Sequence, residues 1–343
     1  MARRRKIFVA EPFDWVTEFQ ARLEAGGCEA LMGRDAEAEA RNPYTVEELI
    51  QICQEMDGII LSSRERLPRA FMQGVPRLRV ISKVGIGVER IDVAAATEAG
   101  IVVGHTPVPE NYTTVSETTL LSMLALVKRL EHSQRHLRAG GWRDGNVVHG
   151  MLHGRTVGLI GLGRVGQAVA ERLRSFGVRL LVADPYIAPE QARAAGGELV
   201  PLEQLLREAD VVSVHVVITP ETTDLLNERT LRMMKPTAVI VNTARGEAID
   251  EEALVRALRE GWVAGAALDV FKQEPIRPDH PLLKLDNVIL TPHVAGWAAE
   301  AIRSIWDAAL ENCLRGVRGE PPLYLKNPEV LPRWRERLAR LDR

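Results

Sequence analysis

The sequence is poor in the features that define several classes of protein. Its 343 residues include only three cysteines, Cys28, Cys53 and Cys313, which lie far apart. Cysteines so few and so scattered form neither a disulfide framework nor a metal-binding cluster, and they are typical of a reducing cytoplasm. No run of 18 apolar residues is present, so we expect no membrane span. The formal net charge of −2 argues against nucleic acid as a partner.

The first residues do not match a secretion signal either. Arg3–Lys6 are basic, but only four apolar residues, Ile7–Ala10, follow before Glu11 and Pro12. A signal peptide needs a longer apolar segment, so we interpret Ile7–Ala10 as a first β-strand of a cytoplasmic protein.

What the sequence does contain is an alternation of short apolar runs with helical patterns. Such alternation is typical of α/β folds, in which crossover helices connect the strands of a parallel sheet. The predicted strands are Ile7–Ala10, Gly58–Leu61, Val80–Ser82, Val157–Ile160, Leu180–Val182, Val211–His215, Ala238–Val241, Ala264–Leu268 and Val288–Leu290. The predicted helices between them include Val46–Gln54, Val165–Phe176, Leu202–Glu208 and Glu251–Arg259.

Two longer helices are predicted at the borders of the second α/β series, over Val115–Ala139 and Ala298–Val317. A chain of this length favours two domains. We therefore predict two Rossmann-like or flavodoxin-like domains with parallel sheets. A nucleotide-binding domain of residues 105–295 would be inserted into a discontinuous substrate-binding domain of residues 1–104 and 296–343. The mixed charges of Arg333–Arg343 predict a solvated helix at the end.

A glycine-rich motif opens the second series. Gly161, Gly163 and Gly166 follow a predicted strand and begin a helix in the pattern G-x-G-x-x-G. The first glycine permits the tight turn, the second lets the backbone approach a pyrophosphate, and the third lets helix and strand pack closely. The helix N-terminus then offers N–H groups to the phosphates, and Arg164 adds a positive charge beside them.

The acidic residue that such a motif requires is also present. Asp184 ends the next predicted strand, 18 residues after Gly166, where its carboxylate can accept hydrogen bonds from ribose hydroxyls. A 2′-phosphate would meet this negative charge, and the following Pro185 and Tyr186 supply no arginine to hold it. The sequence therefore predicts NAD rather than NADP as the cofactor.

Three polar segments follow later strands of the same series and contain Arg245, Glu274 and His293. Ligands in such sheets bind outside the carboxyl ends of the strands. A planar guanidinium such as that of Arg245 can hold a substrate carboxylate with two parallel hydrogen bonds. His293 suits proton transfer because histidine titrates near neutral pH, and an acid such as Glu274 beside it would favour the imidazolium. We therefore predict these three residues as the catalytic group of a hydride-transfer enzyme.

In these motifs the sequence resembles the D-2-hydroxyacid dehydrogenase family, which includes D-3-phosphoglycerate dehydrogenases, glyoxylate/hydroxypyruvate reductases and D-lactate dehydrogenases. The resemblance implies an NAD-dependent oxidoreductase that acts on a small 2-hydroxy or 2-oxo acid, with Arg245, Glu274 and His293 as its catalytic residues. The matching segments are Gly161–Gly166, Asn242–Gly246, Leu268–Asp269, Glu274-Pro275 and Pro292-His293.

The resemblance also implies further cofactor contacts. Asp269 would face the nicotinamide carboxamide. His215 and Thr222 would line the cofactor from a loop in which Val217 replaces the usual proline. The remaining cofactor-binding residues implied are Val165, Thr243, Ala244 and Gly296.

The substrate side of the family is matched by Lys83–Asp92, whose backbone amides would meet the substrate carboxylate at Ile86 and Gly87. This Gly-x-Gly form is most similar to phosphoglycerate dehydrogenases. Ser62, however, stands where many of those carry an arginine for the phosphate, with Arg64 and Arg66 nearby as substitutes. Phosphoglycerate and hydroxypyruvate or glyoxylate therefore both stay open as substrates.

Alternative interpretations use the same scaffold. An NAD(H)-sensing corepressor would not need the catalytic residues, and formate dehydrogenases carry glutamine where Glu274 stands. The histidine pairs His132/His136 and His149/His153 have the spacing of metal ligands but no third ligand, so we predict no metal site. The predicted partners are a small-molecule substrate and a second copy of the chain. We expect the homodimer because the 115–139 helix has more apolar residues than packing against a single domain would require.

Overall fold

We describe the protein from a computed structural model, which places residues 3–12, 16–35, 38, 42–62 and 64–343. The chain divides into two compact units, Met1–Asn111 with Ala299–Arg343, and Tyr112–Ala298. The sequence placed the boundaries at 104/105 and 295/296. The functional roles that we assign to the two domains stay predictions.

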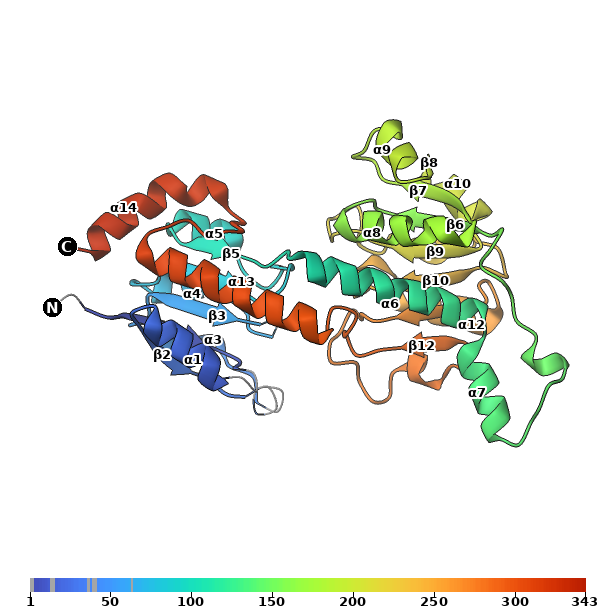
Figure 1. Cartoon of the computed structure of the whole chain (residues 1–343), viewed down its shortest axis with the longest axis horizontal. Helices are drawn as coiled ribbons and strands as arrows, with labels where there is room; N and C mark the ends of the chain where they lie inside the picture. The colour runs from blue at the N-terminus through green and yellow to red at the C-terminus, as the bar shows by residue number, and fades with distance from the viewer. Residues whose placement is uncertain (1–2, 13–15, 36–37, 39–41, 63) are drawn as a thin grey trace. The chain divides into compact units, whose positions relative to one another are not determined.

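The first unit contains a five-stranded parallel sheet in the order β2-β1-β3-β4-β5 (Figure 1). Its strands are β1 (Arg5–Val9), β2 (Cys28–Met32), β3 (Gly58–Leu61), β4 (Val80–Lys83) and β5 (Val102–Gly104). Its helices include α1 (Val16–Ala25), α3 (Val46–Cys53), α4 (Arg69–Gly74), α5 (Val93–Glu98), α13 (Ala299–Arg318) and α14 (Leu331–Leu341).

Alternation along β1 shows why helices cover both faces of this sheet. Ile7 belongs to a core with Leu310 of α13, whereas Phe8 belongs to a second core with Leu49 of α3 and Phe71 of α4. Successive side chains of a strand point to opposite faces, so a strand without polar alternation must be buried on both.

The C-terminal helix differs from the solvated helix that the sequence predicted. Trp334 of α14 is only 1% exposed, and its Nε1–H donates to the carbonyl of Arg79 at 3.0 Å. Arg337 donates to the carbonyls of Leu78 and Ala99 at 2.9 and 3.0 Å, and burial lowers its pKa to about 10. One face of this charged helix therefore packs on the first unit, which its mixed charge did not reveal.

The second unit contains a seven-stranded parallel sheet in the order β12-β11-β10-β9-β6-β7-β8. Its strands are β6 (Thr156–Ile160), β7 (Arg179–Ala183), β8 (Glu198–Leu199), β9 (Val211–Val214), β10 (Val239–Asn242), β11 (Gly265–Leu268) and β12 (Val288–Leu290). Its α-helices include α7 (Leu130–Arg138), α8 (Arg164–Leu173), α9 (Pro189–Ala194), α10 (Leu202–Glu208), α11 (Glu228–Leu231) and α12 (Glu251–Glu260), and most of α6 (Pro109–Val127) also lies here. Short 3-10 turns complete the two units: η1 (Gly145–Val147), η2 (Arg174–Phe176), η3 (Gly246–Ala248), η4 (Pro281–Lys284) and η5 (Pro328–Val330).

Both faces of this second sheet are covered as well. Leu159 of β6 packs with Met123 of α6 and Val169 of α8. The next residue, Ile160, belongs to the opposite core with Leu254 of α12. The carboxyl ends of the strands are left to the loops, and these loops carry the predicted site residues.

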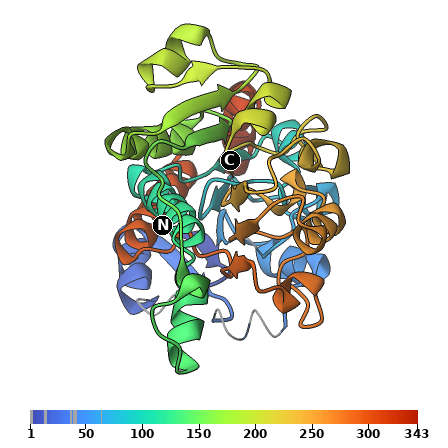
Figure 2. The ribbon, with the colours of Figure 1, turned by 90° about the vertical axis from the view of Figure 1, so that its right-hand side faces the viewer.

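The predicted single helix over 115–139 is wrong. The chain turns at Arg129, whose φ of +49° lies in the left-handed region that ends a helix, and α6 and α7 are separate. The Val127 carbonyl accepts a hydrogen bond from the Gly150 N–H at 2.9 Å, so a later loop replaces the next helical turn. The α7 helix and the loop after it project from the second sheet as an arm, residues 130–151 (Figures 1 and 2).

No helix among the described residues is both long and apolar enough to cross a membrane.

Candidate active site

The glycine-rich turn joins β6 to α8. Gly161 has a φ of +94°, and a Cβ there would lie 2.6 Å from the carbonyl oxygen of His215. A Cβ on Gly166 would lie 2.4 Å from the carbonyl oxygen of Gly161. Around Gly163, the N-cap of α8, no described atom lies within 4 Å of such a Cβ. The turn is therefore tight against the sheet and open where Arg164 and Val165 begin the helix, as phosphate binding requires.

Asp184 lies beside this turn, immediately after β7. Its two carboxylate oxygens accept hydrogen bonds from the N–H groups of Leu162 and Tyr186, both at 2.9 Å. These bonds fix the carboxylate next to the glycines without burying it. A carboxylate held in this way can receive ribose hydroxyls, so the residues present fit a dinucleotide.

His215 follows β9 and touches the same turn through its backbone. Its Nε2 lies 2.9 Å from the Ser213 hydroxyl, whereas its Nδ1 is buried without a hydrogen-bond partner among the described residues. Burial lowers the pKa of His215 to about 4, so the ring is neutral at neutral pH. An unpaired buried ring nitrogen beside the glycine turn is a further feature that fits a polar ligand there.

Thr222 has a different environment. Its hydroxyl donates to the Val217 carbonyl at 2.7 Å and accepts from the Thr219 N–H at 2.7 Å, so it closes the loop after β9. Val217, at the position where the family usually has proline, is 74% exposed. The cofactor contact predicted for Thr222 stays a prediction.

Arg245 is held at the carboxyl end of β10 by a network around Asn242. The Asn242 Oδ1 accepts from the Ala244 N–H at 3.0 Å, and its Nδ2 donates to the Arg245 carbonyl at 2.9 Å. The Thr243 hydroxyl lies 2.8 Å from that of Thr119 on α6. This short loop therefore presents the half-buried Arg245 from a fixed backbone.

Asp269 follows β11 and organises the loop of residues 291–296. It is 2% exposed, and its carboxylate accepts from the Thr291 hydroxyl at 2.5 Å and from the N–H groups of Val294 and Ala295, both at 2.9 Å. Gly296 follows in the same loop. The contact of Asp269 with a nicotinamide carboxamide stays a prediction, whereas its support of the His293 loop is a feature that the sequence did not reveal.

Glu274 and His293 lie in contact, as the sequence predicted. The His293 Nδ1 lies 2.7 Å from one Glu274 carboxylate oxygen, and the other oxygen accepts from the Phe271 N–H at 3.0 Å. His293 has a φ of +55°, a left-handed conformation that a non-glycine residue rarely adopts. Its side chain is 46% exposed, so Nε2 is left for a ligand while Nδ1 faces the carboxylate.

The electrostatics of Glu274 connect the pair with Arg245. Burial alone would raise the pKa of Glu274. The hydrogen bond and charge of His293, the Phe271 N–H and the charge of Arg245 outweigh burial and hold this pKa below its usual value. Because β10, β11 and β12 are neighbours in the sheet, their loops bring Arg245, Glu274 and His293 to one edge.

Ile86 and Gly87 lie in the first unit, after β4. Gly85 has a φ of +108°, and its N–H donates to the Thr106 hydroxyl at 2.7 Å. The Ile86 carbonyl lies 3.1 Å from the His105 Nδ1. These contacts anchor the segment at the carboxyl end of the first sheet.

The same edge of the first sheet carries a cluster that sequence reasoning missed. Glu11, after β1, is 4% exposed and accepts hydrogen bonds from the Ser62 hydroxyl and, at 2.7 Å, from Arg64. The only sequence signal was an acidic residue directly after a predicted strand. The structure thus pairs the positive charge of Arg64 with a buried carboxylate.

The histidines of the two pairs set aside as metal ligands lie against backbone carbonyls. His132 lies 2.9 Å from the Asn146 oxygen, and His136 lies 2.9 Å from the Trp142 oxygen.

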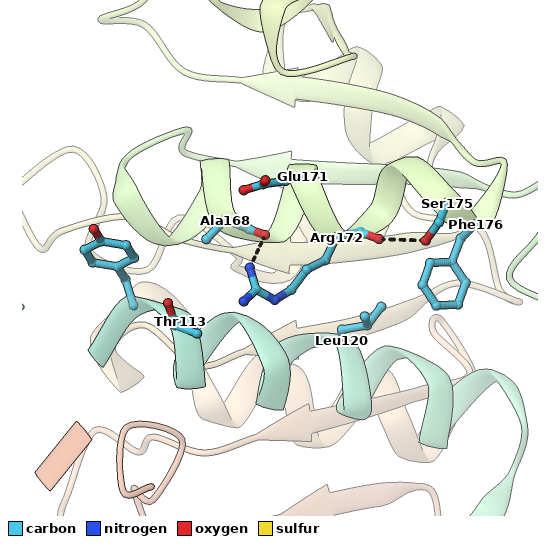
Figure 3. Close-up of a pocket in the computed structure, with 8 residues that line it drawn as sticks. Thr113, Leu120, Ala168, Glu171, Arg172, Ser175 and Phe176 are labelled. Carbon is cyan, nitrogen blue, oxygen red and sulfur yellow. Dashed lines mark hydrogen bonds between the residues drawn. The ribbon is translucent and has the colours of Figure 1, made fainter. Parts of the chain in front are cut away.

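A separate groove of about 600 Å³ lies between α6 and α8 (Figure 3). Leu120 and Phe176 line it together with Glu171 and Arg172, and Arg172 donates to the Ala168 carbonyl at 3.1 Å. The catalytic candidates do not line this groove, so it is distinct from the site at the strand ends.

Comparison with known proteins assigns this arrangement to a family. Residues 120–295 match the family described as D-isomer specific 2-hydroxyacid dehydrogenase, NAD binding domain. The chain is 40% identical to a glyoxylate reductase of Korarchaeum cryptofilum over 295 residues. This alignment covers 84% of this chain and 88% of that protein. It is also 38% identical over 306 residues to a D-3-phosphoglycerate dehydrogenase of Methanocaldococcus jannaschii, covering 89% of this chain and 58% of that one.

The fold is shared with solved structures. One is the NADPH-dependent glyoxylate/hydroxypyruvate reductase of Sinorhizobium meliloti in complex with NADP and malonate, which is 31% identical. It superposes with a TM-score of 0.80 over 96% of this chain and 98% of that one.

Proposed function

The chain belongs to the D-isomer specific 2-hydroxyacid dehydrogenase family, and on that premise we propose that it reduces a small, unphosphorylated 2-oxo acid such as glyoxylate or hydroxypyruvate with NADH. It is an oxidoreductase of this family with a domain that binds NAD or NADP. The observation that carries the proposal is the 2.7 Å contact between His293 and Glu274, at the sheet edge that also holds Arg245.

Each of the three residues has a distinct role in the proposed reaction. Arg245 binds the substrate carboxylate and polarises the neighbouring carbonyl. His293 donates the proton on Nε2 to the carbonyl oxygen, and in the reverse direction it accepts that proton. Glu274 favours the imidazolium and keeps the ring oriented through Nδ1. A bound nicotinamide dinucleotide, held by the glycine turn and Asp184, supplies the hydride.

Asp184 favours NADH over NADPH in this proposal. Its carboxylate is fixed beside the glycine turn by two backbone N–H groups, so it cannot turn away from a 2′-phosphate without losing both bonds. The S. meliloti relative is NADPH-dependent, whereas a D-lactate dehydrogenase of Aquifex aeolicus was solved with NAD, so the family accommodates either cofactor. The preference of this chain therefore depends on the residue after β7 and not on family membership.

The cluster on the first sheet favours an unphosphorylated substrate. Ser62 occupies the position at which many phosphoglycerate dehydrogenases carry a phosphate-binding arginine, and the nearby Arg64 is neutralised by Glu11. A phosphate would meet a buried carboxylate that already holds the adjacent cation. Among the substrates that the sequence left open, this arrangement supports glyoxylate or hydroxypyruvate over a phosphorylated acid.

The proposal includes a homodimer formed through the arm and the groove of the second unit. The arm presents Trp142, 79% exposed, beside Arg143, and the groove offers Leu120 and Phe176 beside Glu171. Exposed apolar groups of this size mark interaction sites. In a two-fold symmetric dimer, the arm of each copy would place its tryptophan and arginine against the apolar and acidic residues of the other copy's groove, so the contact would form twice. Sedimentation of a monomer at micromolar concentration would contradict the dimer, and Trp142→Glu should weaken it.

The test of the activity is NADH oxidation with glyoxylate, hydroxypyruvate, phenylpyruvate, 2-oxoglutarate and phosphohydroxypyruvate. We expect the highest kcat/KM with glyoxylate or hydroxypyruvate and the D isomer of any chiral product. A preference for phosphohydroxypyruvate would overturn the substrate assignment, and no turnover with any 2-oxo acid would overturn the proposed function.

A further inference from the structure

A single carboxylate holds both ends of the loop that carries Glu274. The loop, residues 271–280, runs between β11 and η4 without regular secondary structure. Near its start, the Lys272 N–H donates to Glu251 Oε1 at 2.7 Å. At its end, the His280 Nε2 lies 3.4 Å from Glu251 Oε2. Glu251 itself lies outside the loop, as the first residue of α12.

The second contact, at an ion-pair distance, involves a histidine ring whose orientation is fixed by its other nitrogen. The His280 Nδ1 accepts from the Leu282 N–H at 3.3 Å, so the ring proton belongs on Nε2. His280 therefore caps η4 through Nδ1 while its Nε2 side faces the Glu251 carboxylate. The side chains of Glu251 and His280 are only 16% and 18% exposed, so water competes little for this contact.

The helix that supplies Glu251 is itself rigidly placed. Asp250 caps α12 by accepting from the Ala253 N–H at 3.1 Å, and Leu254 and Leu258 are buried in the core. An acidic residue in the first turn also interacts favourably with the helix dipole. The irregular 271–280 loop is thus bonded to a regular helix, α12, whose position is fixed by its N-cap and by the core.

The same region joins the Glu274 loop to the loop of Arg245. A Cβ on Gly246 would lie 2.0 Å from the carbonyl carbon of Phe271, so the two backbones are in direct contact. The Lys272 ammonium also pairs with Asp224, whose N–H donates to the Glu247 carbonyl at 2.8 Å. A shift at residue 272 would therefore move both loops.

We propose that Glu251 is a positioning residue, which fixes Glu274 against His293 by holding the 271–280 loop at Lys272 and His280. The inference rests on the proposed function, since it concerns the same catalytic pair. A small misplacement of a catalytic group slows the chemical step much more than it weakens binding.

The first test compares Glu251→Ala with a matched control, Glu252→Ala. Glu252 lies in the same helical turn, is exposed, and has no hydrogen bond or ion pair within the part of the chain that the structure describes. We expect kcat to fall about tenfold in Glu251→Ala, with the KM for the 2-oxo acid and the Kd for NADH within about twofold of wild type. Glu251→Gln keeps an oxygen for the Lys272 N–H and should recover part of the loss. Equal kcat values in the Glu251→Ala and Glu252→Ala variants would overturn the proposal.

A double-mutant cycle separates positioning from a general loss of structure. If Glu251 acts through Glu274, adding Glu251→Ala to Glu274→Ala should lower kcat by less than about twofold, because the contact that it supports is already gone. An undiminished tenfold loss in the double variant would show that Glu251 acts elsewhere.

Amide hydrogen exchange tests the same inference without using activity. In Glu251→Ala, peptides covering 271–280 should exchange faster, and peptides covering 291–296, whose N–H groups bond to Asp269, should not change. This readout keeps the two proposals apart. Inactive wild-type protein with a loosened loop in Glu251→Ala would reject only the proposed function, whereas unchanged exchange in an active enzyme would reject only the role of Glu251.

Discussion

The two units share one architecture, a parallel sheet with helices on both faces, yet the carboxyl edges of the sheets carry different chemistry. In the second unit the edge presents Arg245, Glu274 and His293, with a histidine ring left half exposed. In the first unit the charges of Glu11 and Arg64 satisfy each other at the end of the sheet. The same fold supplies an edge in each unit, and the residues at the strand ends give each edge its own chemistry.

The largest effect should follow from removing the proposed proton donor of the second unit. His293→Ala should lower kcat by about 10²–10⁴, the usual range for a general acid, while the Kd for NADH changes little. Stopped-flow and steady-state kinetics measure the two quantities. His149→Ala, an exposed histidine on the arm, is the control. A His293→Ala variant with wild-type kcat would remove the contrast between the two edges.

The next largest effect concerns substrate binding at the same edge. Arg245→Lys should raise the KM for the 2-oxo acid by about 10- to 100-fold, because lysine cannot form two parallel bonds to a carboxylate. Arg259→Lys, on the exposed side of α12, should leave the KM unchanged. An unaltered KM in Arg245→Lys would indicate that the substrate carboxylate binds to the first unit, and that the carboxyl edge of the second sheet does not hold it.

Cofactor choice should depend on the second unit alone. Asp184→Asn keeps an oxygen for a backbone N–H but removes the charge, so the ratio of kcat/KM for NADH over NADPH should fall about tenfold. Melting temperature reports whether the loop stays intact. If the wild-type enzyme uses both cofactors equally, the role assigned to Asp184 is wrong.

The pH dependence of reduction should report the Glu274–His293 pair. The pKa of Glu274 lies below its usual value, so this carboxylate is ionised at neutral pH and stabilises the protonated ring of His293. Reduction needs that proton. In Glu274→Gln the ring loses the negative charge of its partner, so the alkaline limb of the reductive kcat/KM profile should move to lower pH. An unmoved limb would mean that another acid is the partner of His293.

The smallest effect should come from the first unit. Glu11→Gln removes the charge that neutralises Arg64, so kcat/KM for phosphohydroxypyruvate should rise a few-fold (about 3- to 10-fold) relative to glyoxylate, with kcat for glyoxylate nearly unchanged. Competition assays with both acids measure this ratio. A large loss of kcat in a well-folded Glu11→Gln variant would show that the first edge also takes part in the chemistry.

The sequence by itself determined the fold class and the residue types of the site. Apolar runs of strand length between helical patterns predict parallel sheets because both signals are local periodicities. The glycine motif, Asp184 and the three residues after β10, β11 and β12 could be found for the same reason: parallel strands end at a common edge, so position in the chain predicts position in space.

Only the tertiary structure decided which of these groups touch and which other residues support them. The contact of Glu274 with His293, the use of Asp269 to hold the 291–296 loop, and the pairing of Glu11 with Arg64 join residues 19, 25 and 53 positions apart. The break at Arg129 likewise depends on a bond between Val127 and Gly150. No local pattern encodes such contacts, because they depend on how loops of irregular backbone pack once the strands are in register.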